Sequence, residues 1–281
     1  MMFWKSTYNE FIKIAAKPRS YIGIGVISVI VGIILYAMYK EGHGFIGAIT
    51  WRMEQSLTLE GNILNGNLVA YIILQTLIIH VPLLIVLVTG DLVSGEGAMG
   101  TIRLLLTKPV SRTNILLSKY LAGCGYTFVM LVWLVFLSLV IGKLLFGTGD
   151  LIVLNDDVIV VLQQQELGWR FACAFSTAFL SLIMVATLSL TFSCFADNSI
   201  GPIVTTMAVI ILFTILGALN VPALQKIQPY LFTNHMSAWR YFFEDPLPIG
   251  KIFNSIGILL IHIVGLLAIA VYKFKRKDIL S

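Results

Sequence analysis

Charged side chains are scarce in this chain and absent from long stretches of it. Asp, Glu, Lys and Arg make up 12% of its 281 residues, whereas soluble globular domains carry about a quarter. Six stretches contain none of these residue types, and each is close to the roughly 20 apolar residues that cross the hydrocarbon core of a bilayer. These stretches are residues 21–39, 71–90, 120–142, 171–196, 201–219 and 252–272. The distribution excludes an ordinary soluble domain.

The backbone has no water to bind inside a bilayer, so a spanning stretch must satisfy its hydrogen bonds within a helix. We therefore predict an all-α membrane protein, a single transmembrane domain over residues 1–281 with six transmembrane helices. In residues 1–19, apolar side chains recur at three- and four-residue steps, which predicts an amphipathic helix in the membrane interface. An ordinary anchor without a mechanical role would show the same pattern. The apolar residues are Trp4, Tyr8, Phe11, Ile12 and Ala15.

Residues that could carry chemistry are also few. Cys124, Cys173 and Cys194 have no CxxC spacing and lie in or beside the apolar stretches, so we expect them to pack rather than to react. The sequence has no G-x-x-x-x-G-K-[ST] loop to hold a phosphate, and no nucleophile with an obvious acid partner. No cofactor is therefore expected in this chain. The spans also lack a carboxylate to bind a driving ion, which disfavours a secondary transporter.

Lys and Arg are unevenly divided between the segments that join the spans. Twelve of the 19 lie in the N-terminal segment, residues 91–119 and the C-terminal tail. The positive-inside rule then places both termini in the cytoplasm, and we predict a multi-pass protein of the bacterial plasma membrane. Anionic lipid headgroups would attract these basic residues, so the basic pI of about 9.1 does not require nucleic-acid binding.

The connecting segments differ in character. We predict outside loops at residues 40–70 and 143–170 that are too short to fold as independent domains. Residues 220–251 contain four prolines and several aromatics, which predicts short interfacial or re-entrant pieces with aromatics at headgroup depth. Residues 197–200 leave only a tight turn between the fourth and fifth spans. Asn198 or Ser199 can cap the helix that follows.

Residues 91–119 form a short basic loop between the second and third spans. Within the loop, residues 101–107 show the periodicity of a short helix that Pro109 stops. Ser111 is a suitable N-cap for a second helix that runs into the third span. The sequence therefore predicts a short helix held between two spans.

This loop carries a resemblance to a known family. The matching residues run Gly95-Glu96, Gly100-Thr101-Ile102-Arg103-Leu104-Leu105-Leu106, Lys108-Pro109-Val110-Ser111-Arg112 and Leu117-Ser118-Lys119-Tyr120. They resemble a stretch of the type-2 family of ATP-binding-cassette transporter permeases, in the branch similar to the nitrous-oxide-reductase maturation and bacitracin-resistance permeases. This sequence has Gly97-Ala98-Met99 where many relatives carry further charges.

The resemblance implies the type-2 exporter fold and a permease subunit that works by alternating access on a drug, peptide, lipid or ion. It implies a separate ATPase subunit, which binds ATP and magnesium, and a second permease copy in a homodimer or heterodimer. The loop would contain the coupling helix that docks into the ATPase, and residues 1–19 would be the connecting helix. The coupling residues would be Glu96, Gly100, Thr101, Arg103, Leu105 and Arg112.

Weakly polar residues in the spans are candidates for a substrate path, although they are equally usual in helix packing. Glu96 and Arg103 would also suit a merely solvated loop. A second hypothesis is a polytopic membrane enzyme with an interfacial site of His80, His262 or His235 with Asp245. For His80 and His262, packing or a neutral hydrogen bond fits better than a metal or proton site. The path candidates are Gln75, Thr76, Ser138, Thr187, Ser189, Thr205 and Thr206.

Overall fold

The computed structural model describes residues 2–54, 63–77, 80–101, 110–155, 158–219 and 221–277. Within these ranges six helical segments are long and apolar enough to cross a membrane. They are Arg19–Gly42, Val81–Ala98, Arg112–Phe146, Gln164–Phe195, Ile200–Ala218 and Ile249–Arg276. The prediction of a predominantly helical, multi-pass membrane protein is confirmed.

The N-terminal segment is the predicted amphipathic helix. Helix α1 (Met2–Ala16) ends before Pro18 and exposes Trp4 and Tyr8, which are 70% and 66% accessible, while Ile14 is buried. The Ser20 hydroxyl donates to the Ile14 carbonyl at 2.6 Å and closes the turn into α2 (Arg19–Glu54). Helix α2 continues well past residue 39, so much of the predicted 40–70 loop is helical.

The second predicted span is two helices rather than one. Helix α3 (Gly66–Leu77) and helix α4 (Val81–Thr89) meet at His80, and residues 78 and 79 lie outside the described ranges. The His80 amide donates to the Leu77 carbonyl at 2.9 Å, which is a turn contact. Pro82 supplies no amide hydrogen, so the helical ladder cannot run through this point. The short helix α5 (Ser94–Ala98) follows α4.

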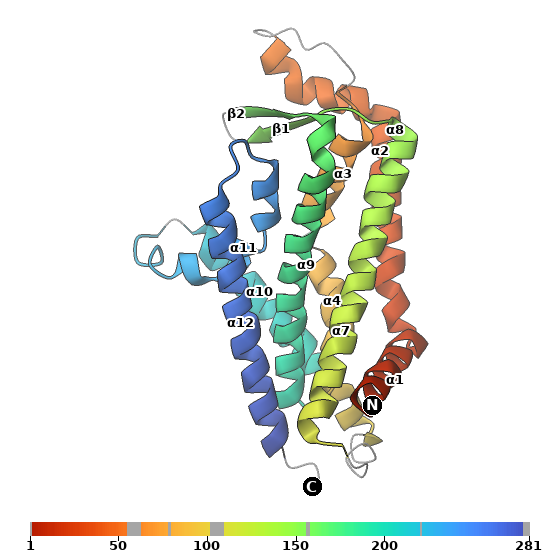
Figure 1. Cartoon of the computed structure of the whole chain (residues 1–281), viewed down its shortest axis with the longest axis vertical. Coiled ribbons are helices and arrows are strands. Elements are labelled where there is room, and N and C mark those ends of the chain that lie inside the picture. Colours follow the sequence, from red (N-terminus) through yellow and green to blue (C-terminus); the bar gives the residue numbers. More distant parts are fainter. Residues whose placement is uncertain are drawn as a thin grey trace.

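The helix that runs into the third span begins where it is predicted to, directly after the Ser111 cap. The Ser111 hydroxyl accepts from the Asn114 amide at 3.3 Å at the start of α7 (Arg112–Val135). A π-helical segment, η1 (Phe136–Ile141), and then α8 (Gly142–Phe146) continue the helix. Together they form one rod that reaches from the 91–119 loop to the opposite end of the molecule (Figure 1).

A small β-hairpin follows α8, where a loop is predicted. Strands β1 (Leu151–Asn155) and β2 (Val158–Leu162) pair antiparallel, with Leu151 opposite Leu162. Two runs of β-branched and aliphatic residues around an Asn-Asp-Asp turn are a hairpin signal that the sequence analysis missed. The Asn65 and Asn67 amides donate to the Asp150 and Gly149 carbonyls at 2.7 Å and fix the segment that leads into the hairpin to the start of α3.

Helix α9 (Gln164–Phe195) is the central helix, in contact with α4, α7, α10 and α12. Its buried face carries small residues such as Ala178 and Ser189, which let neighbouring helices approach closely. The tight turn to α10 (Ile200–Ala218) is confirmed. Of the two proposed caps Asn198 serves, because its side-chain oxygen accepts from the Gly201 amide at 2.8 Å.

Residues 221–248 fold into short pieces, as predicted. These pieces are η2 (Gln228–Tyr230), α11 (Phe232–His235) and η3 (Ala238–Phe243), and α12 (Ile249–Arg276) follows them. The aromatics are not all at the surface, however. Trp239 and Phe243 are fully buried and pack edge-to-face on Tyr71 of α3, with ring centroids 5.8 and 5.1 Å apart.

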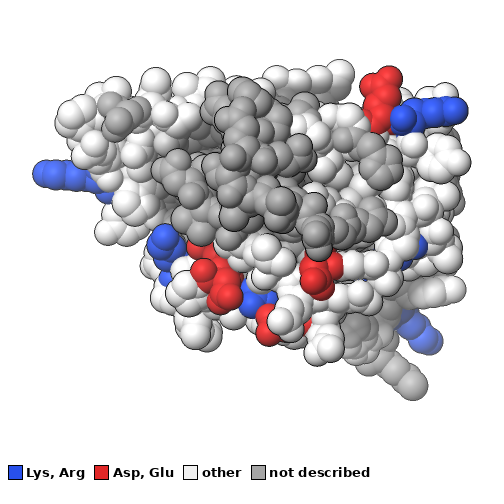
Figure 2. Space-filling view, turned by 90° about the horizontal axis from the view of Figure 1, so that it is seen from above, with Lys and Arg blue, Asp and Glu red and all other residues white. Residues whose placement is uncertain are grey.

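Both termini lie at one end of the molecule, together with α1, and the β-hairpin lies at the other (Figure 1). Viewed from the hairpin end, acidic and basic side chains both appear, scattered over mostly uncharged surface (Figure 2). Helix α12 ends with Lys273, Lys275 and Arg276 at the end that holds the termini. The N-terminal segment, the described part of residues 91–119 and the end of α12 therefore lie at the same end of the molecule. These are the basic segments that are predicted to face the cytoplasm.

The two ends provide a test of orientation. In a cysteine-free background, we expect a cysteine at Thr148, exposed near the hairpin, to react with a membrane-impermeant thiol reagent in intact cells. A cysteine at Asn114, exposed at the start of α7, should react only after the membrane is opened. Mass shifts of the purified protein measure both reactions. The reverse pattern would invert the predicted orientation.

Candidate functional site

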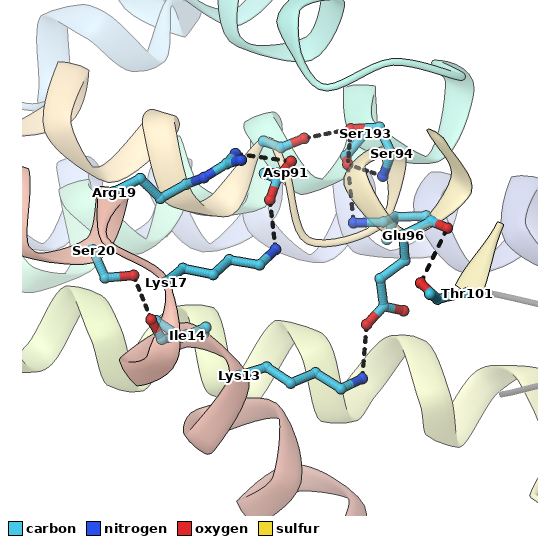
Figure 3. A network of polar contacts seen from close by, with 12 residues as sticks. Lys13, Ile14, Lys17, Arg19, Ser20, Asp91, Ser94, Glu96, Thr101 and Ser193 are labelled. Atoms are coloured by element: carbon cyan, nitrogen blue, oxygen red, sulfur yellow. Dashed lines mark hydrogen bonds and ion pairs between the residues drawn. The ribbon is translucent and has the colours of Figure 1, made fainter. Parts of the chain in front are cut away.

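A cluster of buried charges surrounds the beginning of the 91–119 segment. We call it the charged cluster. It joins α1, the α1–α2 turn, the residues after α4 and helix α7, and Figure 3 shows most of it at close range. Its members are Glu10, Lys13, Lys17, Arg19, Asp91, Glu96 and Lys119.

Four of these residues alternate in sign and form a closed ring. Lys13 Nζ lies 2.6 Å from Glu10 and 2.7 Å from Glu96. Lys119 Nζ lies 2.8 Å from Glu10 and 2.7 Å from Glu96. Each carboxylate therefore bridges two ammonium groups, one from α1 and one from α7. This four-charge ring ties α1, α5 and α7 together.

The four-charge ring is largely removed from water. Lys119, Glu10 and Glu96 are 1%, 4% and 6% accessible, whereas the Lys13 side chain is 41% accessible. Burying a lone charge is costly, and good pairing geometry is what makes its burial tolerable. Losing one member would leave each of its two neighbours with a single partner of opposite charge.

Electrostatics keep Lys13 protonated in this setting. Burial lowers the pKa of Lys13, but the hydrogen bonds to Glu10 and Glu96 outweigh it and raise the pKa above its ordinary value. The stability that this pairing contributes is therefore fully present below the ordinary lysine pKa of about 10.4. It is lost only as the pH rises through the still higher folded pKa.

Asp91 forms a second set of ion pairs beside the ring. Lys17 Nζ and Arg19 Nη1 lie 2.7 and 2.9 Å from its two carboxylate oxygens, and Asp91 is 2% accessible. Gly95 packs over this carboxylate, which leaves no room there for a side chain. The α1–α2 turn is therefore held to the short connection between α4 and α5.

A serine from α9 supports the same segment. The Ser193 hydroxyl accepts from the amides of Val93 and Ser94 at 3.2 and 2.9 Å. These amides lie at the start of α5 and have no partner within that helix, so a residue about 100 positions away caps it. Figure 3 shows these contacts beside Asp91. Helix α1 and two spans, α7 and α9, thus position the five residues of α5.

The far end of the 91–119 segment is also held. Arg112 Nη1 donates to the carbonyls of Lys275 and Lys277 at 3.1 and 2.8 Å, which satisfies the end of α12. Lys277 Nζ in turn lies 2.8 Å from the Ala196 carbonyl and 2.9 Å from Asp197. The hydrogen bond from Lys277 holds the pKa of Asp197 below its ordinary value.

The proposed coupling residues divide into three groups. Glu96 faces inward to Lys13 and Lys119 rather than outward, because its carboxylate is the link between the two ammonium groups. Gly100 adopts a positive φ of 69°, and the Thr101 hydroxyl donates to the Glu96 carbonyl at 3.4 Å. Arg103 and Leu105, with most of the expected docking helix, lie outside the described residues.

The structure does not gather the proposed substrate-path residues in one place. Ser138, Thr187 and Thr206 are buried, and each donates to a carbonyl of its own helix at 2.6 to 2.8 Å. Ser189 is buried against Gly90. Gln75, Thr76 and Thr205 are exposed. Helix packing accounts for the first group, and the second group lies on an outer face.

Two of the histidines have ordinary hydrogen-bonding roles. His235 is buried, with Nδ1 2.9 Å from the Ser255 hydroxyl and Nε2 2.8 Å from the Pro229 carbonyl. His262 Nδ1 lies 2.9 Å from the Ile258 carbonyl, and its ring packs on Phe232. No group of three His, Cys, Asp or Glu residues suited to a metal occurs in the part of the chain that the structure describes. The three cysteines there are unpaired thiols.

Comparison with known proteins places the chain in a family. The sequence model of a family described as "Protein of unknown function (DUF2705)" matches residues 25–280. This chain belongs to the DUF2705 family. It is 27% identical over 199 residues to the uncharacterized protein YhcI of Bacillus subtilis, covering 69% of this chain and 63% of YhcI. It is 25% identical to the uncharacterized membrane protein YdbK of the same organism, covering 70% and 76%. The chain thus spans less than two thirds of YhcI.

The partners of Glu96 in this DUF2705 protein could not be found by sequence analysis. Lys119 lies 109 positions from Glu10, and Lys13 lies 83 positions from Glu96. Asp91 and Glu96 follow directly after an apolar span, and Lys119 stands directly before the next one. Charges next to apolar spans can indicate buried ion pairs between span ends, but the same pattern occurs for charges in a solvated loop.

The four-charge ring gives a stability prediction. Changing Glu96→Ala leaves Lys119 buried with a single carboxylate, and we expect a loss of about 3–5 kcal/mol in the free energy of unfolding. Asp197→Ala removes a carboxylate that is 91% exposed, and the expected change is about 0–1 kcal/mol. Unfolding of both purified variants in detergent measures the difference. Equal losses of unfolding free energy in the two variants would mean that the four-charge ring does not stabilise the 91–101 segment.

The contact between Arg112 and α12 gives a second prediction. Changing Arg112→Ala removes two hydrogen bonds to the last turn of α12, so this turn should fray and expose Lys275 and Arg276 to trypsin. Lys5→Ala, an exposed basic residue on α1 at the same end, is the matched control. We expect cleavage several-fold faster than in wild type or in the control, measured by mass spectrometry. An unchanged rate would show that the turn is held by other contacts.

Proposed function

We propose that this protein is the membrane-spanning permease subunit of an ATP-driven transporter of the type-2 ATP-binding-cassette exporter family. The observation that carries the proposal is the bracing of the 91–101 segment. The motif residue Glu96 is held by Lys13 of α1 and Lys119 of α7 at once, through two contacts of 2.7 Å. A segment that takes force from a soluble partner requires such support.

The residues on both sides of 102–109 are fixed to other helices. On one side, α5 is fixed by the four-charge ring and by Ser193 of α9. On the other, Ser111 caps α7, and Arg112 is bonded to the end of α12. Displacement of the intervening residues would therefore reach α1, α7, α9 and α12 together. The helices would move as a body, which is what alternating access needs.

The proposal divides the work between polypeptides. The sequence has no phosphate loop, so ATP and magnesium would bind to a separate ATPase subunit. Helix α10 is the most exposed of the six candidate spans, with 11% of its apolar window buried. A second permease copy, identical or related, and membrane lipids would cover such surfaces. The proposed location is the bacterial plasma membrane, with both termini in the cytoplasm.

Substrate translocation would occur between two such subunits, with a drug, peptide, lipid or ion as cargo. The alternatives are weaker. The enzyme hypothesis needs a histidine paired with an acid. Among the described contacts, His235 bonds to Ser255 and His262 to the Ile258 carbonyl, and neither partner is an acid. A secondary transporter would need an ion site, and the predicted spans contain no carboxylate.

Co-expression with an ATP-binding-cassette ATPase from a neighbouring gene tests the proposal. The isolated chain should hydrolyse no ATP, and the pair should co-purify. The double change Arg103→Ala with Leu105→Ala should weaken co-purification at least tenfold and leave thermal stability unchanged. Lys5→Ala, exposed at the same end, should bind like wild type.

Two outcomes would contradict the proposal. One is full association and transport by the double variant. The other is transport by proteoliposomes that contain this chain alone under an ion gradient, because it would favour a secondary transporter. The first outcome tests assembly with the ATPase, and the second tests the energy source, so the two parts of the proposal are tested separately.

A further inference from the structure

The interruption between α3 and α4 presents polar side chains on the outside of the bundle. Gln75, Thr76 and His80 are all exposed, although they belong to a stretch that is otherwise apolar. We call these three residues the polar strip. Sequence analysis expected packing or a neutral hydrogen bond for His80; the hydrogen bond is present, to the Thr76 carbonyl at 2.9 Å, but the side chain is exposed rather than packed.

Contacts with α8 and α7 give the depth of the polar strip. At one end, Gly66 packs against the backbone of Lys143 and leaves no room for a side chain. At the other end, Gly123 faces Thr89 and Leu92. These two levels coincide with the ends of the third predicted span, residues 120–142. His80 lies between them along the chain, and so at a depth that the predicted span of residues 120–142 covers.

Other spans expose polar residues such as Ser176 and Thr214, whose hydroxyls each bond a carbonyl of their own helix, whereas the third span has a wholly apolar outer face. Within residues 120–142 the exposed side chains of the third span are all apolar. They are Phe128, Val129, Val132, Phe136 and Val140. Polar and ionisable groups at the bilayer centre are costly when they face lipid. The polar strip therefore calls for a polar occupant.

The hydrogen bonds within the strip specify what that occupant must offer. His80 Nδ1 lies 2.9 Å from the Thr76 carbonyl, which can only accept, so Nδ1 carries the hydrogen. In the neutral ring Nε2 is then an acceptor. The Thr76 hydroxyl donates to the Ile72 carbonyl at 2.9 Å and keeps its lone pairs free for a donor. The Gln75 amide oxygen adds a further acceptor.

We propose that the polar strip of Gln75, Thr76 and His80 binds the hydrogen-bond-donating head group of an amphipathic molecule, of which a primary alkylammonium is the simplest. The acceptors would take the N–H groups, and the apolar residues beside the strip would contact the chain. Interrupted spans near the midplane are where membrane carriers hold ligands. The transport of such a molecule rests on the proposed function, whereas its binding does not.

Binding is measured on the purified full chain in detergent, without any ATPase, with dodecylamine as the probe at neutral pH. Dodecyltrimethylammonium, which has the same chain and charge but no N–H donor, is the matched probe. We expect dodecylamine to raise the melting temperature of the protein more than dodecyltrimethylammonium does. His80→Phe and Thr76→Val should weaken dodecylamine binding at least tenfold and leave the weaker effect of the other amphiphile unchanged.

Two further variants keep the test independent of folding. His80→Gln retains an acceptor and should keep most of the binding, whereas Ser176→Ala, at an exposed polar residue of α9, should bind like wild type. Equal binding of both amphiphiles to every variant would show simple partition and overturn the proposal. Loss of self-association in His80→Phe, with dodecylamine binding unchanged, would assign the strip to a contact with a second copy and overturn it too.

Discussion

Two carboxylates and two ammonium groups hold the end of the bundle where the termini lie. Glu10, Lys13, Glu96 and Lys119 come from three elements, and no pair of them would be tolerated at this burial without the other two. Replacing such a ring by apolar residues would cost little stability, so stability alone does not explain it. Its effect is to fix the geometry between α1, α5 and α7.

The rest of the fold adapts to that constraint. Helix α4 ends at Thr89, and Gly90, with a helical φ of −67° and ψ of −20°, leads toward α5, which Glu96 and Ser193 hold in place. Gly90 has no side chain, and a Cβ there would collide with Ser189 of α9 and Ile203 of α10. Helix α9 is thereby drawn against α4 along a face of small residues, and the remaining helices pack around α9.

The opposite end is held by a different set of contacts. Asn65 and Asn67 bond to the backbone at Asp150 and Gly149, and the Asp150 side chain accepts from the Gln164 amide at the start of α9. The buried Arg170 pairs with Glu166 at 3.0 Å and donates to the Phe242 and Glu244 carbonyls. Charged groups therefore contribute at both ends, but the four-charge ring lies at the end that carries the 91–119 segment.

The polar strip belongs to neither end. It lies where α3 stops and α4 starts, so the same interruption that lets the chain turn at His80 also exposes polar groups within the predicted span. A continuous helix through Pro82 would have lost a hydrogen bond without gaining such a surface. The interruption is therefore compatible with a binding role as well as a structural one.

The sequence by itself determined the features that depend on neighbours along the chain. The six apolar stretches, the amphipathic pattern around Trp4 and Tyr8, and the Ser111 cap all follow from local burial and local hydrogen bonds. Tertiary structure decided the rest. Glu96 pairs with Lys13 and Lys119, and Arg112 bonds to α12, because charges at the ends of spans select partners by proximity in space. The exposure of His80 depends on which helices flank an interruption, and no periodicity within the stretch itself contains that information.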